Sequence, residues 1–394
     1  MKGILSICGA LAAGEYLASF FPSFAALWPV VAFALVLVTL FGYGFAVRFW
    51  PLVFFFLLGV GLFLRASTDD VLLYREQPWL RGRELRARRS SVATSPAWVR
   101  PVRADLARRM SVGLEDDRAA VDLVRAIVLG ERGRLRSDLK DVFVSSGTLH
   151  VFAISGLHVA VVAQVLLYLL ALFLVPRRLM GLFSVPLLWS YVILIGCPPS
   201  AIRAALMASV LLLAPVCWRR PNGVRAWALA FLIVHLVSPR MIVNVGNILS
   251  FVVMLSIVLV GETVRDLAKW KQSLVLTFAA WAVGVPISAH VFGRVTPGGI
   301  LANLVLIFAA KMTVVAGAVG ILASTVSTTL AAHINNLGAL FVRLMVGLST
   351  AVSKLPFSNF ETGSWTISSC LLWSGVLLIL IFMIVKVRNS RKPF

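Results

Sequence analysis

The sequence predicts an all-α fold, a polytopic transmembrane helical bundle of about 11–12 spans with discontinuous helices and a short extramembrane helical connector. Hydrophobic residues make up 60% of the 394 residues and charged residues only 13%, which excludes an ordinary soluble globular domain. Apolar runs of about 18 residues or more, the length that a membrane-crossing helix needs, recur along the chain. Glycine, proline and polar residues interrupt several runs, and irregular backbone at membrane depth is tolerated where it lines a cavity.

The apolar runs define the predicted spans in chain order. Three runs joined by very short turns predict an N-terminal three-helix membrane segment over residues 1–65. Residues 145–322 are predicted to form the core, and residues 323–394 an amphipathic segment and a final transmembrane helix with a basic tail. The runs are residues 4–20, 24–47, 50–64, 151–175, 182–195, 201–216, 227–237, 243–260, 274–291, 300–322, 336–355 and 365–385. The run at 336–355 either crosses the membrane or lies flat on it, so the count is about twelve or eleven.

Residues 66–144 differ from the rest and are predicted to form the extramembrane connector. They are polar and rich in arginine, and 12 of the 16 acidic residues lie between Asp69 and Asp141. Apolar residues recur at helical spacing from Leu106 to Ile127, which predicts one amphipathic helix over residues 105–129. This helix is expected to lie near the membrane surface or to be a solvated connector, and a short helix is expected over 135–144.

The charge distribution supports a topology with alternating sides. The chain carries a net charge of +21, and only four acidic residues lie outside the connector. Basic clusters fall in alternate loops, as expected when positive loops stay in the cytoplasm. These clusters are Arg177 and Arg178, then Arg219, Arg220 and Arg225, then Arg265, Lys269 and Lys271. The same imbalance would also suit a polyanion as cargo.

Polar residues at the start of the fourth run are the first candidate site. His150, Ser155 and His158 lie at or inside the mouth of an apolar run, and Gly156 weakens the helix there. Ionisable groups inside membrane segments are rare and by default indicate function. Ser155 and His158 are three residues apart and share a helical face. They are expected to line a wet cavity, with interhelical hydrogen bonding as the alternative.

Arg203 is the second candidate. Pro198, Pro199 and Ser200 precede it, a composition that favours the start of a helix. Free N–H groups, the positive end of the helix dipole and Arg203 would together attract an anion. An arginine whose charged end reaches back to the interface is the competing explanation.

Three further polar residues lie in the later spans. Lys311 falls in the middle of its run with no acidic residue in the same helix, so it faces a hydrated passage or is neutral. His290 and Asn303 flank the preceding turn and are expected to share an outer vestibule. Each of the three is a candidate contact for cargo.

Several chemistries have no support in the sequence. The chain has no G-x-x-x-x-G-K-[ST] and no H-x-H-x-D motif, and its four cysteines are scattered singly, so we predict no cofactor, no metal site, no disulfide framework and no catalytic residue. Two alternatives from other classes are kept. One is an intramembrane serine hydrolase using Ser155 and His290, although Ala153 replaces the glycine of a nucleophile elbow. The other is a transporter of small anions, although the spans contain almost no acidic coupling residue.

These motifs resemble those of the ComEC-type bacterial competence proteins, the family of DNA-uptake channels. The resemblance covers roughly residues 120–320, and its first block is the most specific part. That block comprises Leu129-Gly130-Glu131-Arg132, Ser146-Gly147-Thr148-Leu149-His150 and Ala153-Ile154-Ser155-Gly156-Leu157-His158. Further similarities are Pro198-Pro199-Ser200-Ala201-Ile202-Arg203, Ser238-Pro239, Gly246 with Leu249-Ser250-Phe251, and His290-Phe292-Gly293-Arg294 leading to Asn303.

The resemblance implies a multi-pass protein of the bacterial cytoplasmic (inner) membrane that is not an enzyme and passes single-stranded DNA into the cytoplasm during natural transformation. The path is expected to be lined by His150, Ser155, Gly156, His158, Arg203, His290, Asn303 and Lys311. Phe152 is expected to stack on bases. Expected partners are single-stranded DNA, membrane lipid, a separate DNA-receptor protein and a cytoplasmic ATP-driven translocase; homo-oligomerisation is left open. The oligonucleotide-binding and metallo-β-lactamase-like domains of the family are not expected in this sequence. Asn244 and Asn247 lie in the neighbourhood where the family usually has an acidic residue.

Overall fold

A computed structural model describes residues 98–131, 137–151, 155–356 and 358–362, together with Ser369 and Trp373. In these residues the secondary structure is almost wholly helical, with strands only at β1 (Arg294–Val295) and β2 (Phe360–Glu361), which pair antiparallel. The all-α prediction is therefore confirmed. The predicted spans at 4–20, 24–47 and 50–64, and nearly all of that at 365–385, lie outside the described residues.

The chain divides into two compact units. The described part of one unit is residues 222–251, and the described part of the other lies within residues 98–221 and 252–373. By length and composition, four described helices could cross a membrane. These are α13 (Val245–Thr263), α14 (Lys269–Phe292), α15 (Gly298–Ala323) and α16 (Thr328–Ser353). The domain boundaries expected from the sequence remain predictions.

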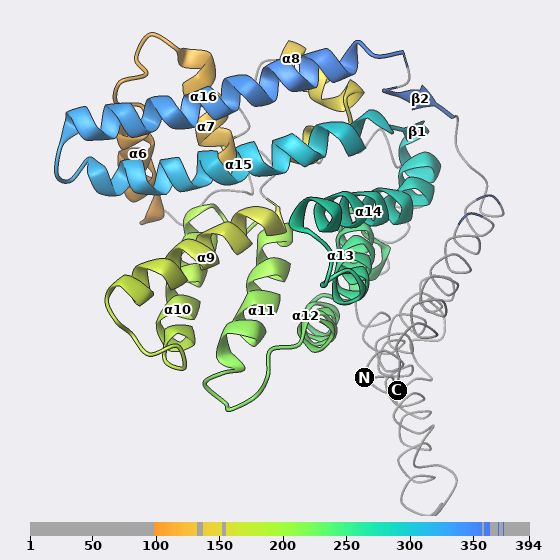
Figure 1. Cartoon of the computed structure of the whole chain (residues 1–394), viewed down its shortest axis with the longest axis horizontal. Helices are drawn as coiled ribbons and strands as arrows, with labels where there is room; N and C mark the ends of the chain where they lie inside the picture. The colour runs from red at the N-terminus through yellow and green to blue at the C-terminus, as the bar shows by residue number, and fades with distance from the viewer. Residues whose placement is uncertain are drawn as a thin grey trace, which may run out of the picture. The chain divides into compact units, whose positions relative to one another are not determined.

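In the larger unit α15 and α16 form a long antiparallel hairpin (Figure 1). Both helices have 26 residues, so each is about 39 Å long, enough for the hydrocarbon core. The segment that was expected over 336–355 to cross or to lie flat begins earlier, at Thr328, where Ser327 accepts a hydrogen bond from the Leu330 N–H. Small residues on α15, among them Ala309, Ala316 and Gly320, are buried and permit close helix packing.

The connector does not contain the single helix expected over 105–129; this prediction is wrong. The structure has α6 (Val99–Arg109) and α7 (Arg118–Leu129) with a turn between them. Gly113 takes a left-handed conformation with φ +79°, which a continuing helix cannot accommodate. Asp117 then starts α7 by accepting a hydrogen bond from the Ala120 N–H at 2.9 Å. The apolar spacing was compatible with one helix, but the turn residues interrupt it.

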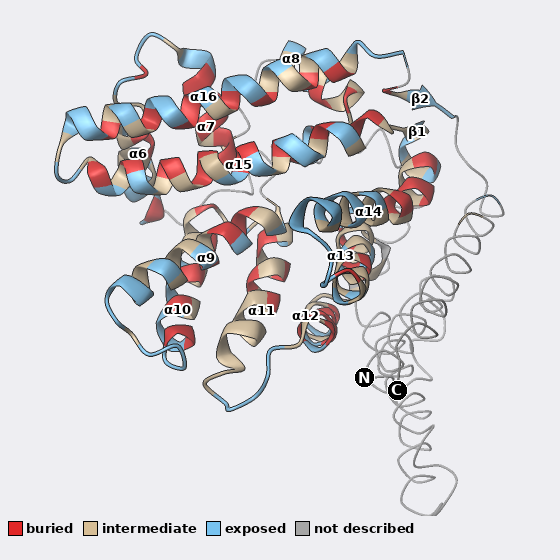
Figure 2. Cartoon of the chain, in the orientation of Figure 1, coloured by how far each residue is buried: buried red, intermediate tan, exposed pale blue. Residues whose placement is uncertain are grey.

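Helix α7 is part of the core of its unit rather than a solvated connector helix. Eight of its 12 residues are buried, as its colouring in Figure 2 shows. Ile127 and Leu129 belong to one apolar cluster with Leu306 of α15 and Met345 of α16. The short helix α8 (Ser137–Ser145) also packs on α16.

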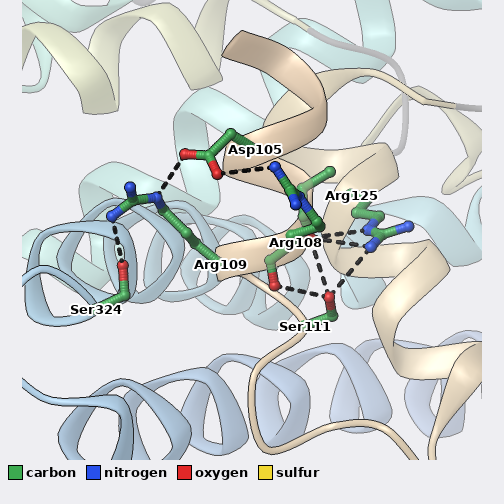
Figure 3. A network of polar contacts seen from close by, with 7 residues as sticks. Asp105, Arg108, Arg109, Ser111, Arg125 and Ser324 are labelled. Atoms are coloured by element: carbon green, nitrogen blue, oxygen red, sulfur yellow. Dashed lines mark hydrogen bonds and ion pairs between the residues drawn. The ribbon is translucent and has the colours of Figure 1, made fainter. Parts of the chain in front are cut away.

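Several connector arginines are used in holding this unit together (Figure 3). Arg125 donates to the Ala107 carbonyl at 3.0 and 3.2 Å and to Ser111 Oγ, so it satisfies the C-terminal end of α6. Arg109 binds Asp105 at 2.7 Å and reaches Ser324 Oγ at the end of α15. These arginines already have internal partners, which makes them poorer candidates for holding DNA.

The buried Asn335 of α16 holds the turn between α6 and α7. Its Nδ2 donates to the carbonyls of Arg109 and Val112 at 2.9 and 3.0 Å. Asn336 donates to the Gly113 carbonyl at 3.0 Å. Two amide side chains thus satisfy backbone carbonyls that lie outside any helical ladder.

An ion pair between the connector and α16 should make stability depend on pH. Arg343 binds Asp117 at 2.7 Å, and the Ala120 N–H and this guanidinium together lower the pKa of the Asp117 carboxyl. A lowered folded-state pKa stabilises the fold above the unfolded value, about 3.9, and this contribution is lost as the pH falls below it. We expect Asp117→Asn, which keeps a capping oxygen, to lower stability by about 0.2–1 kcal/mol at pH 7.

Thermal unfolding of the detergent-solubilised protein, followed by circular dichroism at pH 7 and pH 3, checks this expectation. The difference between wild type and Asp117→Asn should be smaller at pH 3 than at pH 7, because stability that rests on a lowered pKa is lost as the pH falls from the unfolded value through the folded one. A difference that is equal at both pH values would contradict the role given to the ion pair.

Helices α9 (Gly156–Leu172), α10 (Met180–Leu194) and α11 (Pro199–Leu213) pack side by side in the same unit (Figure 1). Their core combines Val159 of α9, Leu188 and Val192 of α10, and Ala201 and Ala205 of α11. Each of these helices begins and ends within a few residues of its predicted apolar run, because the length of the run limits the length of the helix.

The described part of the smaller unit contains α12 (Gly223–Val237), the 3₁₀ turn η4 (Pro239–Val243) and the start of α13. His235 is fully buried between the rings of Phe231 and Phe251, at 4.0 and 5.7 Å. Its Nδ1 lies 2.8 Å from the Phe231 carbonyl and its Nε2 lies 3.2 Å from Asn247 Nδ2. Asn247 therefore contacts a buried histidine.

Candidate functional site

A glycine turn precedes the fourth predicted span and packs against the start of α15. Gly147 has φ +70°, and a Cβ built there would lie 2.5 Å from Thr296 Oγ1. Gly299 lies close to the Gly147 carbonyl, since its Cβ would be 3.4 Å from that oxygen. Ser146 and Thr148 on either side are buried, and Thr148 Oγ1 lies 3.1 Å from Ser349 Oγ of α16. We call this arrangement the glycine joint (Ser146–Thr148, Thr296–Gly299 and Ser349).

His150 lies just beyond the glycine joint on the 3₁₀ turn η3 (Leu149–Val151). Its side chain is exposed, and Nδ1 lies 3.1 Å from the Gly147 carbonyl. Phe152, expected to stack on bases, lies outside the described residues. His150 is therefore positioned by the joint and stays accessible.

Ser155 and His158 form the N-terminal cap of α9. The Ser155 N–H donates to His158 Nδ1 at 3.2 Å, and Ser155 Oγ lies 3.1 Å from the same nitrogen. Ser155 Oγ also accepts from the Leu157 N–H at 3.3 Å. Since Nδ1 accepts from a backbone N–H, we assign the ring proton to Nε2. The hydroxyl of Ser155 is engaged within its own cap and not by His290, so the serine hydrolase alternative gains no support.

Arg203 lies on α11 and is 7% exposed. Ala201 and Ala205 point into the core shared with α9 and α10, and Arg203, two positions from each, lies on the opposite face of α11. A Cβ on Gly156 would lie 3.4 Å from that of Ala204, so the starts of α9 and α11 adjoin. The structure thus brings Gly156 next to α11 but does not place Arg203 on the face toward α9.

The other three predicted residues lie on α14 and α15. His290 is exposed in the last turn of α14, and Asn303 follows the intervening turn on α15, with Oδ1 buried and without a hydrogen-bond partner among the described residues. Lys311 is exposed near the middle of α15. One turn before it, Phe308 is 54% exposed, with its ring against that of Phe341 at 6.1 Å.

Sequence reasoning missed Phe308 and the glycine joint. The joint had a usable signal, since two serines, a glycine and a threonine precede an apolar run, and Pro297-Gly298-Gly299 mark a second turn. No local signal paired these two turns, which are about 150 residues apart. Phe308 resembles ordinary membrane filler until its exposure beside Lys311 is known.

Comparison with known proteins decides the family. The profile of the family described as competence protein matches residues 127–387, which is more than half of the chain. The chain belongs to this family. The match includes all the predicted site residues and most of the core helices, so the resemblance found in the sequence motifs is confirmed.

Two curated relatives of this competence protein show how much of a longer protein it covers. It is 26% identical over 209 residues to ComE operon protein 3 of Bacillus subtilis (strain 168), which is 52% of this chain and 27% of the relative. It is 34% identical over 154 residues to the competence protein ComA of Neisseria gonorrhoeae, which is 35% of this chain and 21% of the relative. The chain thus spans about a quarter of the length of these relatives. No solved structure matches.

Proposed function

We propose that this competence protein forms an inner-membrane channel through which single-stranded DNA enters the cytoplasm during natural transformation. Family membership supports a role in competence, and the described helices long enough to cross a membrane support a location within it. A DNA strand needs cationic groups that follow its phosphates and aromatic faces on which its bases stack.

The exposed pair of Lys311 and Phe308 on α15 carries the proposal. The two residues are three positions apart and share one helical face near the middle of a 26-residue apolar helix. A lysine facing lipid at that depth would cost at least about 2.5–3.5 kcal/mol. A face that lines a hydrated passage avoids this cost and offers a cation beside an aromatic ring.

The remaining predicted residues are proposed to extend this path. His150 is accessible next to the glycine joint, and His158 and Ser155 cap the helix that follows it. Since the sequence has no nucleotide-binding loop, we propose that a separate ATP-driven translocase pulls the strand and that a separate receptor delivers it.

We expect Lys311→Met to lower uptake of labelled single-stranded DNA and transformation frequency about tenfold, the cost of roughly 1.4 kcal/mol at one phosphate contact. Lys311→Arg should retain most activity because it keeps the charge. The measurement is transformation in cells with equal membrane levels of each variant, together with internalised radiolabelled DNA.

Lys354→Met is the matched control, because Lys354 is an exposed lysine at the end of α16 rather than in its middle. It should leave uptake within about twofold of the wild type. Full transformation by Lys311→Met at a normal protein level would overturn the assignment of this face to the DNA path.

A further inference from the structure

Two segments that are far apart in sequence are joined at one end of the α9–α11 bundle. The guanidinium of Arg178, between α9 and α10, lies 3.3 Å from the ring centroid of Trp218, which follows α11. Trp218 is 77% exposed and has φ +57°, while Leu174 after α9 has φ +56°. A positive φ is uncommon for non-glycine residues, so the chain has a specific backbone conformation both where it leaves α9 and where it leaves α11. Because Arg178 stacks on Trp218, the segment after α9 and the segment after α11 form one continuous surface.

This surface is strongly cationic. It carries Arg177, Arg178, Arg219 and Arg220, all exposed, and we call these four residues the arginine patch. The sequence has no aspartate or glutamate between Asp141 and Glu262, so α9, α10, α11 and the loops that join them supply no carboxylate. Among the described residues none of the four arginines makes an ion pair. Within the described part of the chain the patch is therefore open to an external anion.

An apolar rim adjoins the arginine patch. Leu172, Phe173 and Leu174 are 77%, 76% and 88% exposed at the end of α9. Exposed leucine and phenylalanine beside arginine and tryptophan are typical of the membrane–water interface. Helix α9 has 17 residues and is about 26 Å long, somewhat less than the hydrocarbon thickness of about 30 Å. The end of this helix is therefore suited to the level of the lipid headgroups.

We propose that the arginine patch is a binding site for the phosphodiester headgroups of anionic phospholipids, with Trp218 setting the position of Arg178. A guanidinium binds phosphate oxygens through two parallel N–H groups, which suits this ligand. The rim favours a lipid over a nucleic acid, since acyl chains can cover Leu172 and Leu174 as well as Phe173, whereas bases would stack only on the rings of Phe173 and Trp218. The proposal does not depend on DNA conduction.

The test uses the full chain purified in dodecyl maltoside and measures binding of fluorescent phosphatidylglycerol and phosphatidylcholine. We expect the wild type to bind phosphatidylglycerol at least tenfold more tightly than phosphatidylcholine. R177Q/R178Q/R219Q/R220Q should reduce phosphatidylglycerol binding at least tenfold. The matched control R265Q/K269Q/K271Q removes three exposed charges from another basic segment, the loop after α13 and the first turn of α14, and should change binding less than twofold.

Trp218→Leu provides a second variant that keeps every charge and tests the positioning of Arg178. It should weaken phosphatidylglycerol binding about threefold without changing the circular dichroism spectrum. Millimolar inorganic phosphate should displace little lipid, because it lacks an acyl chain for the rim. Undiminished lipid binding by the quadruple variant, or by Trp218→Leu, would overturn the proposal. Displacement of the lipid by micromolar oligodeoxythymidylate would also overturn it and would assign the patch to nucleic acid.

Discussion

Gly147→Ala is expected to destabilise the protein by about 2–5 kcal/mol. A non-glycine residue with φ near +70° costs roughly 1–2 kcal/mol, and overpacking a filled site costs about 1–3 kcal/mol more. The added methyl group would overlap the Thr296 side chain, whose Cβ lies 2.7 Å from the position of the new atom. Because the glycine joint connects the start of α15 to the turn before α9, we expect a lower unfolding temperature and less protein in the membrane.

Gly347→Ala is the control, since a Cβ at this position of α16 meets nothing within 4 Å. An alanine there should be neutral or stabilising by up to about 1 kcal/mol, because alanine favours helix more than glycine does. Adding Thr296→Gly to Gly147→Ala should recover the part of the loss that comes from overlap. Equal unfolding temperatures for Gly147→Ala and the wild type, measured in detergent, would contradict the close packing proposed for the glycine joint.

Arg203→Gln is expected to lower DNA uptake roughly a hundredfold, a larger effect than at the exposed Lys311. Arg203 is 7% exposed, and if it contacts a phosphate of the strand, losing that desolvated charge pair would cost about 2–5 kcal/mol. Internalised labelled DNA and transformants are counted in strains that contain equal amounts of each variant. Arg203→Lys, which retains a cation, should keep a substantial part of the uptake.

The result must be separated from a loss of folding, because a buried arginine also supports structure. Thermal unfolding of purified Arg203→Gln should remain within a few degrees of the wild type while uptake falls. An uptake loss that merely follows a lower protein level would remove Arg203 from the proposed path and leave it a structural residue.

Hydrophobic patterning predicted most of the described helices, since α10, α11 and α15 begin and end within three residues of their apolar runs. Local spacing also predicted that Ser155 and His158 share a face, and their side chains are 3.1 Å apart. Patterning failed at residues 105–129, because apolar spacing runs through the turn at Gly113. The turn is stabilised by Asn335 on α16, more than 200 residues away in sequence.

The sequence by itself determined the all-α class, most helix ends and the family, because apolar run length and motif spacing are local properties of the chain. Only the tertiary structure decided that Gly147 meets Thr296, that Arg178 stacks on Trp218 and that Arg203 faces away from the α9–α10 core. It also showed that arginines of the connector are used internally. These contacts depend on how separate helices pack, and packing selects among many pairings that the local pattern allows equally.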